Sequence, residues 1–280
     1  MKFNKGARYL FTKEYDVEGF MEFAAKEGFD FVQVSYESPL KWVGEISKDR
    51  RERIRTLAKR LGLQICVHSV TCGVNVAWTN SGIRQESLRQ LKESIEFAHD
   101  VGAELLIVHP GWKDLIGYRH PEEAYALAIE GHQELAGAAA TYGIRIGIEN
   151  MPPRWTSFCI NAEGAKTMIQ AVDRENVGLT LDIGHANLVG ANAIQEFITI
   201  LSDKIFLIHM HDNDGKGDEH KAIGEGTIDF PKLIDLLVQT GINAPLCIES
   251  SSLDDLIKSK QNLEHFLTMS APKSLPQNNV

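Results

Sequence analysis

Short runs rich in β-branched residues alternate along the chain with longer runs in which apolar residues recur at helical spacing. Short apolar runs predict buried strands, and apolar residues at every third or fourth position predict amphipathic helices. The predicted strands are Ala7–Phe11, Phe31–Tyr36, Gln64–Ser69, Leu105–His109, Arg145–Glu149, Gly178–Asp182, Ile205–His211 and Leu246–Glu249. The predicted helices are Val17–Lys26, Lys48–Leu61, Arg84–Val101, Glu122–Tyr142, Glu163–Val172, Ala191–Leu201, Phe230–Thr240 and Leu253–Leu267.

A strand followed by a helix, repeated eight times, is the pattern of an α/β protein that closes into a (β/α)8 TIM barrel. Glycines stand where helices should end before the next strand, at Gly28, Gly62, Gly102, Gly143 and Gly241. A doubly wound sheet is the alternative, but no glycine-rich phosphate loop follows the first strand. Because no linker divides the repeats, we expect a single barrel domain at 1–268 and a polar tail at 269–280.

Composition adds limits on the class of protein. The chain has 280 residues, 43% hydrophobic and 24% charged, and no apolar run approaches the ~18 residues of a membrane span. Its start lacks an apolar signal region, so we expect a cytoplasmic protein without membrane partners. The net charge of −9 argues weakly against nucleic-acid binding. The cysteines lie far apart without a CxxC, which predicts reduced thiols at Cys66, Cys72, Cys159 and Cys247.

Six consecutive predicted strands, from the third to the eighth, end in side chains that can bind metal. These residues are His68, His109, Glu149, Asp182 with the nearby His185, His211 and Glu249. The carboxyl ends of parallel barrel strands meet on one face, so residues far apart in sequence become neighbours there. Converging carboxylates and imidazoles would repel one another and lose hydration unless a cation compensates them. The sequence therefore predicts a divalent metal site with open positions, suited to zinc, manganese, iron or cobalt.

The remaining histidines carry a weaker signal. Packing or solvation is the expected role of those in predicted helices, namely His99, His120, His132 and His265. His209 lies two positions before His211 and therefore faces the same side of the strand, one layer deeper in the barrel. His209 could hydrogen-bond to a metal-binding residue, or it could simply pack in the barrel interior.

The segments IVHPG, IENMP, LDIGHANL, HMHDNDGKGDEHKAIGEGTIDF and CIES resemble the xylose-isomerase-like TIM-barrel superfamily, and the resemblance covers essentially the whole barrel. Its most specific part is His211–Phe230. The superfamily includes sugar phosphate isomerases and epimerases, dehydratases and endonuclease IV. The resemblance implies one divalent ion, Zn²⁺ or Mn²⁺, held by Glu149, Asp182, His211 and Glu249.

The resemblance to endonuclease IV extends to three zinc ions. It implies ligand sets that are filled here by His68, His109 and Glu149, then by Glu149, Asp182, His211 and Glu249, and finally by His185, Asp218 and His220. A zinc-dependent abasic-site phosphodiesterase acting on nucleic acid is therefore the alternative function. The predicted loops support it poorly: the segment YESPLKWVGE has one lysine and two glutamates, MPPRWTSF has only Arg154 as a cation, and strand 6 reads LDIGH instead of LDTCH.

The function that we expect is a metal-dependent isomerase or epimerase of a sugar or sugar-like substrate, with or without a phosphate group. The resemblance implies that Glu149 and Glu249 transfer protons through an enediolate, and that His185 binds a substrate oxygen. Further candidate contacts to substrate are Trp112, Arg154 and Lys216, together with Trp42, Trp155 and Lys113. A sugar or inosose dehydratase and a non-catalytic relative are further alternatives. The oligomeric state stays open, with a homo-oligomer among the options.

Overall fold

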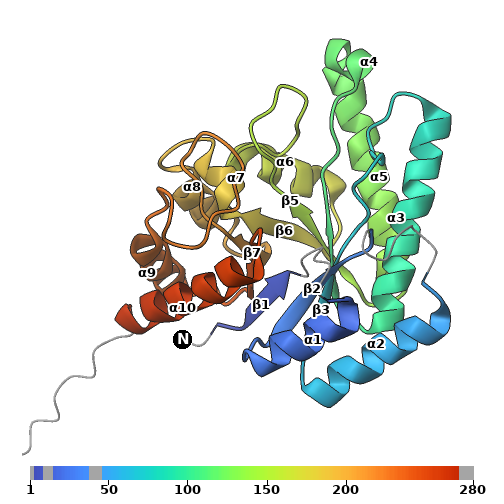
Figure 1. Ribbon diagram of the computed structural model, residues 1–280. Coiled ribbons are helices and arrows are strands. Elements are labelled where there is room, and N and C mark those ends of the chain that lie inside the picture. Colours follow the sequence, from blue (N-terminus) through green and yellow to red (C-terminus); the bar gives the residue numbers. More distant parts are fainter. Residues whose placement is uncertain (1–2, 9–14, 38–45, 271–280) are drawn as a thin grey trace, which may run out of the picture.

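The computed structural model describes residues 3–8, 15–37 and 46–270. Its parallel strands close into a barrel in which every strand pairs with its neighbours in sequence, and β8 pairs with β1 (Figure 1). The strands are β1 Lys5–Arg8, β2 Phe31–Ser35, β3 Gln64–His68, β4 Leu105–Val108, β5 Arg145–Glu149, β6 Val177–Asp182, β7 Ile205–Met210 and β8 Leu246–Ile248. The predicted TIM barrel is confirmed.

Helices follow the strands and surround the barrel. They are α1 Val17–Lys26, α2 Lys48–Leu61, α3 Ser81–Val101, α4 Leu115–Arg119, α5 Pro121–Ala140, α6 Ala162–Val172, α7 Ile183–Asn187, α8 Ala193–Leu201, α9 Phe230–Thr240 and α10 Leu253–Met269. The sequence analysis missed α4 and α7, because five residues are too few to show a helical period. As a consequence His185 lies on α7, where the prediction had placed it at a strand end.

The helix ends follow local side-chain chemistry. The carboxylate of Asp16 accepts the backbone N–H of Gly19 at the start of α1, and the hydroxyl of Ser47 accepts that of Arg50 at the start of α2. Gly62 ends α2 in the left-handed conformation, with φ of 71°, which a side chain would disfavour. Such residues turn the chain back towards the next strand, so the predicted helix–strand boundaries are close to those observed.

The interior of the barrel changes character along its axis. Side chains alternate between the two faces of a strand, so Leu207, His209 and His211 of the β7 region point to the same side. At the amino end of the barrel the interior is a small apolar cluster that consists of Phe31, Cys66, Leu105, Ile107, Leu207 and Cys247. Towards the carboxyl end the buried interior positions are polar, so the ionisable side chains of the barrel interior gather at this end.

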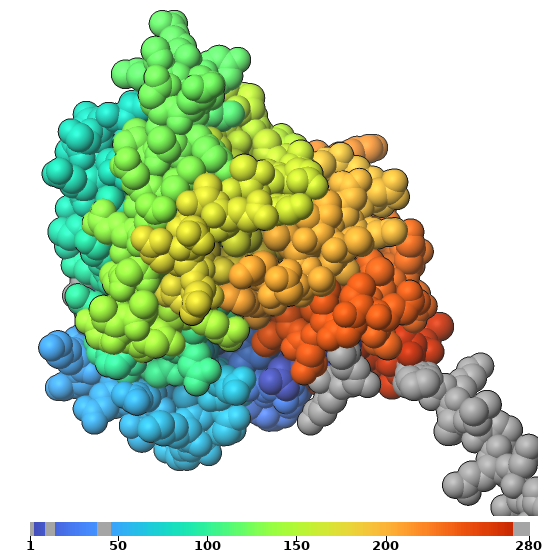
Figure 2. Space-filling view, turned by 180° about the vertical axis from the view of Figure 1, so that it is seen from behind, coloured from blue at the N-terminus to red at the C-terminus, as the bar shows by residue number. Residues whose placement is uncertain are grey.

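The four cysteines agree with the sequence analysis. The cysteines are free thiols, and none of the described helices combines the length and the apolar character needed to cross a membrane. Helix α4 projects beyond the rest of the surface at the top of Figure 2. The predictions for Trp42, for the first strand beyond Arg8 and for the tail from residue 271 lie outside the described residues.

Candidate metal centre

Glu149, at the end of β5, is the junction of the polar cluster. Its Oε2 lies 3.2 Å from Nε2 of His68 and 3.3 Å from Nε2 of His109, and its Oε1 lies 3.0 Å from Nδ1 of His209. The ligand atoms of His68, His109 and Glu149 all lie within 4.8 Å of one another. A carboxylate with one oxygen on each side can serve two neighbouring positions, and Glu149 has that arrangement.

A second group surrounds the imidazole of His209 at the bottom of the polar layer. Nδ1 of His209 is 3.8 Å from Asp182, and Nε2 is 3.4 Å from Glu249. Both carboxylates and the imidazole are buried. His209 therefore lies among Glu149, Asp182 and Glu249, the three carboxylates that the sequence analysis expected around one ion.

Gln33 of β2 holds this group in place. Its amide nitrogen donates to Oε1 of Glu249 at 3.0 Å, so its oxygen is free to accept from Nε2 of His209 at 2.8 Å. With Nε2–H committed to Gln33, Nδ1 of His209 is the nitrogen that faces Glu149 and Asp182. A buried amide thus fixes which imidazole nitrogen points into the cluster.

A third group lies closer to the mouth and includes the histidine that the sequence analysis chose as ligand. The ligand atoms of His185, His211, Asp218 and His220 lie within 4.8 Å of one another. Asp218 is 3.3 Å from Nε2 of His185 and 3.3 Å from Nε2 of His220. His211 stacks on His220 with ring centroids 3.9 Å apart, while its Nε2 is 3.0 Å from Asp182. His211 therefore lies between the second and the third group.

The loop that carries Asp218 and His220 is held by Asp212. The Asp212 carboxylate accepts backbone N–H groups at Asn213, Gly224, Gly226 and Ile228. A side chain at Gly226 would come within 2.4 Å of that carboxylate, and one at Gly184 would come within 2.0 Å of the His211 ring. The two glycines let the loop and α7 close on the site, and His220 itself has a left-handed φ of 50°.

Charge is balanced inside this cluster by imidazoles and one arginine. Burial raises the pKa of Glu149, yet the neighbouring His209 and then His109 hold it well below its usual range. Burial lowers the pKa of His209, but Glu249 and Glu149 outweigh this effect and raise it to about 10. Burial likewise opposes ionisation of Glu249, whereas Arg8, with Nη1 2.9 Å away, leaves the pKa at about 2. The carboxylates thus stay ionised, and the imidazoles whose pKa is raised, among them His185 and His209, hold protons that a metal ion would displace.

The donor set fits a divalent ion. Carboxylate oxygens and imidazole nitrogens are the ligands of zinc, manganese and iron sites, and no thiolate enters the groups described here. Nδ1 of His211 is buried without a hydrogen-bond partner, in a side chain whose other nitrogen faces Asp182 and Asp218. Buried polar atoms without a partner are rare and point to a missing ligand.

The cluster opens into a cavity of about 570 Å³ at the carboxyl end of the barrel. Trp112, Arg154 and His185 line it, as the sequence analysis expected for substrate contacts. Lys216 is exposed in its loop and is absent from the lining. Trp155 is 65% exposed and packs edge-on against Tyr118. Among the tryptophans that the structure describes, Trp112 is therefore the one that lines the cavity.

Sequence reasoning missed three residues in the site: Arg8, Gln33 and Asn150. Arg8 is the last residue of β1 that the structure describes, and it lay inside the predicted strand Ala7–Phe11, where a single arginine gave no signal. Asn150 directly follows Glu149; its amide bonds both backbone groups of Asp182, and its carbonyl is 2.8 Å from Nδ1 of His185. For Gln33 the only signal was a polar residue inside an otherwise apolar strand.

Comparison with known proteins places this geometry in a family. The family described as xylose isomerase-like TIM barrel matches residues 21–268. An uncharacterised protein of Methanocaldococcus jannaschii is 31% identical over 250 residues, which cover 88% of this chain and 83% of that protein. A probable endonuclease 4 of Mesoplasma florum is 26% identical over 66% of each chain.

Among solved structures, a D-tagatose 3-epimerase-like protein superposes with a TM-score of 0.86 at 28% identity, covering 96% of this chain and 98% of the other. Further similar structures are sugar 3-epimerases at lower identity, and these indicate the fold alone. Both sugar epimerases and endonucleases are therefore relatives of this chain.

Proposed function

The chain belongs to the xylose isomerase-like TIM barrel family, and on that premise we propose that it is a metal-dependent isomerase or epimerase of a sugar or sugar-like substrate. One observation carries the proposal. Three buried carboxylates, Glu149, Asp182 and Glu249, converge with imidazoles at the base of a cavity of about 570 Å³. That size suits a small molecule.

Glu149, Asp182 and Glu249 would hold the ion together with one imidazole. The ion would act as a Lewis acid that makes the C–H next to a substrate carbonyl more acidic. Glu149 and Glu249 are ionised at neutral pH, so either can accept the proton from carbon. The opposite carboxylate would first take up a proton from solvent and then deliver that proton to the other face of the carbon, so the product would carry a solvent hydrogen at that position. His185 lines the cavity, and its Nε2 faces Asp218 at the mouth, where a substrate hydroxyl can bind.

Two imidazoles compete for the fourth ligand position. The sequence analysis chose His211, whereas the distances favour His209. Nδ1 of His209 lies 3.0 Å from Glu149 and 3.8 Å from Asp182. Its other nitrogen, Nε2, makes the contact with Glu249 at 3.4 Å. We therefore propose His209 Nδ1 as the fourth ligand of the ion. His211 would then belong to the third group, with His185, Asp218 and His220. Metal analysis of His209→Asn and His211→Asn tests this assignment: the first variant should lose the tightly held ion and the second should keep it. The reverse result would restore His211.

A zinc-dependent phosphodiesterase is the second candidate. The observation that favours it is the third group, since His185, His211, Asp218 and His220 could hold an additional ion beside Glu149 and its two histidines. The cavity mouth argues for the sugar substrate. Arg154 is its only free cation among the described lining residues, since Arg8 is paired with Glu249. Binding to a DNA backbone needs more positive charge than that.

The deciding experiment combines a metal count with solvent exchange. For an epimerase we expect one tightly held ion in protein purified without added metal, and incorporation of deuterium from solvent into one member of a panel of ketoses and sugar phosphates. About three zinc ions, together with nicking of a duplex oligonucleotide that contains an abasic site, would establish the nuclease instead. Loss of water from a substrate would indicate a dehydratase. A Glu149→Gln variant prepared in parallel controls for contaminating enzymes.

A further inference from the structure

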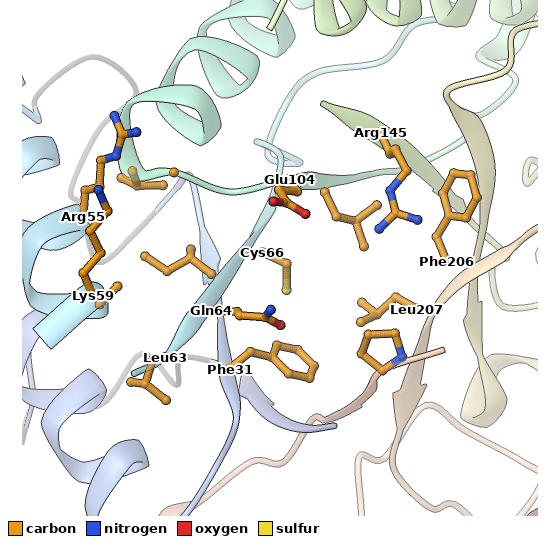
Figure 3. A pocket seen from close by; sticks show the side chains of 16 residues that line it. Phe31, Arg55, Lys59, Leu63, Gln64, Cys66, Glu104, Arg145, Phe206 and Leu207 are labelled. Carbon is orange, nitrogen blue, oxygen red and sulfur yellow. The ribbon is translucent and has the colours of Figure 1, made fainter. Parts of the chain in front are cut away.

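A second cavity, of about 260 Å³, opens at the amino end of the barrel, opposite the metal centre. Several strands begin at its wall: Phe31 starts β2, Gln64 starts β3, Leu105 starts β4 and Arg145 starts β5. Figure 3 shows these side chains converging around Cys66. Nothing in the proposed reaction uses this cavity.

The floor of the amino-end cavity is apolar. Phe31, Cys66 and Leu207 are buried and belong to the inner cluster of the barrel. The ring of Phe31 lies against Gly6 of β1, where an added Cβ would come within 2.2 Å of the ring. Since Gly6 has no side chain, Phe31 can lie flat across the base of the barrel. The floor of the cavity therefore includes the aromatic ring of Phe31 and the thiol of Cys66.

The rim of the amino-end cavity is cationic, in a chain whose net charge is −9. The guanidinium of Arg145 lies 4.8 Å from the ring centroid of Phe206. Arg55 and Lys59, one turn apart on α2, stand on the opposite side in Figure 3. Among the described residues no ion pair engages these three cations, and Glu104 is the only carboxylate that lines the cavity.

From these observations we infer that the amino-end cavity binds a small organic anion with a flat apolar body, of the aromatic carboxylate class. The ring of such a ligand would lie on Phe31 and beside Cys66, and its carboxylate would reach Arg145 or the pair on α2. Unpaired cations around an apolar floor complement this shape and charge, and neither an uncharged apolar ligand nor a polar sugar would satisfy both features. The inference is independent of the proposed function.

The test is isothermal titration of the full-length protein with benzoate and with benzamide, its neutral counterpart. We expect saturable binding of benzoate that is about tenfold tighter than that of benzamide, because charged hydrogen bonds contribute more than neutral ones. Arg145→Gln should weaken benzoate binding about tenfold and leave benzamide unchanged, since it removes a charge and no part of the floor. Arg55→Gln provides a second, independent variant on the opposite side of the rim.

Arg154→Gln is the matched control, because it removes an exposed arginine at the other end of the barrel and should leave benzoate binding unchanged. Amide chemical shifts should move at Phe31 and Arg145 on titration. Three results would each overturn the inference: no saturable binding of benzoate, equal binding of benzamide, or the same loss of binding in Arg154→Gln as in Arg145→Gln.

Discussion

The two ends of this barrel are built from the same strands but have opposite chemistry. Along β5 the chain passes from Arg145 at the amino end, through Gly147, to Glu149 at the carboxyl end, and β3 passes from Cys66 to His68. Because inward-facing positions recur every second residue, one strand supplies both ends with few residues. The carboxyl end concentrates buried ionisable groups, whereas the amino end has an apolar floor with solvated cations around it. The proposed metal site therefore lies at the first end, and the second end holds the apolar cavity with its cationic rim.

Replacing one carboxylate at each end of the barrel should give the largest difference between the two ends in metal affinity and turnover. Glu149→Gln removes the negative charge and replaces one of the two carboxylate oxygens by an amide nitrogen. Metal affinity should therefore fall by more than the roughly 10- to 100-fold typical of a lost outer partner. Turnover should fall about 10²- to 10⁴-fold, the range for a general acid–base group. Metal analysis and solvent-exchange rates measure both effects. Glu104→Gln, at the amino end, is the control and should keep full activity; a fully active Glu149→Gln would refute the site.

Removal of the ion should destabilise the carboxyl end next most strongly. A ligand present at about a thousand times its Kd stabilises the folded state by about 4 kcal/mol, and chelation would remove that contribution. Denaturant unfolding with and without chelator measures the change in free energy. Arg145→Gln should retain the full effect of chelation and Glu149→Gln should show almost none. An equal effect in both variants would mean that the ion binds elsewhere.

Acid should destabilise the helices around the barrel as well as the metal cluster. We expect this effect on stability to be smaller than that of removing the ion. His132 of α5 is buried, and burial lowers its pKa to about 4 against the weaker opposing effect of the Pro110 backbone. Because the folded pKa lies below the unfolded value of about 6.5, the stability is fully present above pH 6.5 and is lost as pH falls towards 4. The loss amounts to about 3 kcal/mol.

Unfolding free energies of the wild type and of His132→Leu, measured from pH 8 to pH 4, test this prediction. As pH falls, the unfolding free energy of His132→Leu should rise relative to that of the wild type. His265→Leu, at an exposed position on α10, is the matched control and should follow the wild type. Parallel pH profiles for the wild type and His132→Leu would show that acid sensitivity arises elsewhere, in the metal cluster.

The fold could be predicted from the sequence to a large extent because its signals are local. The period of α1, α2 and α9 and the stop at Gly62 depend on neighbouring residues alone, and the predicted bounds of these helices match those observed. Helices α4 and α7 were missed because five residues show no period. Arg8, which pairs with Glu249, gave no signal of its own inside the predicted first strand, whose part beyond Arg8 lies outside the described residues.

The sequence by itself determined that the candidate ligands at the strand ends meet at the carboxyl end, because parallel strand ends share one face. Only the tertiary structure decided how these residues group. Gln33 commits one nitrogen of His209 and turns the other towards Glu149, and Asp212 folds the loop that brings Asp218 and His220 beside His211. Contacts within the site join residues up to 241 positions apart, as Arg8 and Glu249 do. Their distances follow from the closure of the barrel, which no local pattern in the sequence encodes.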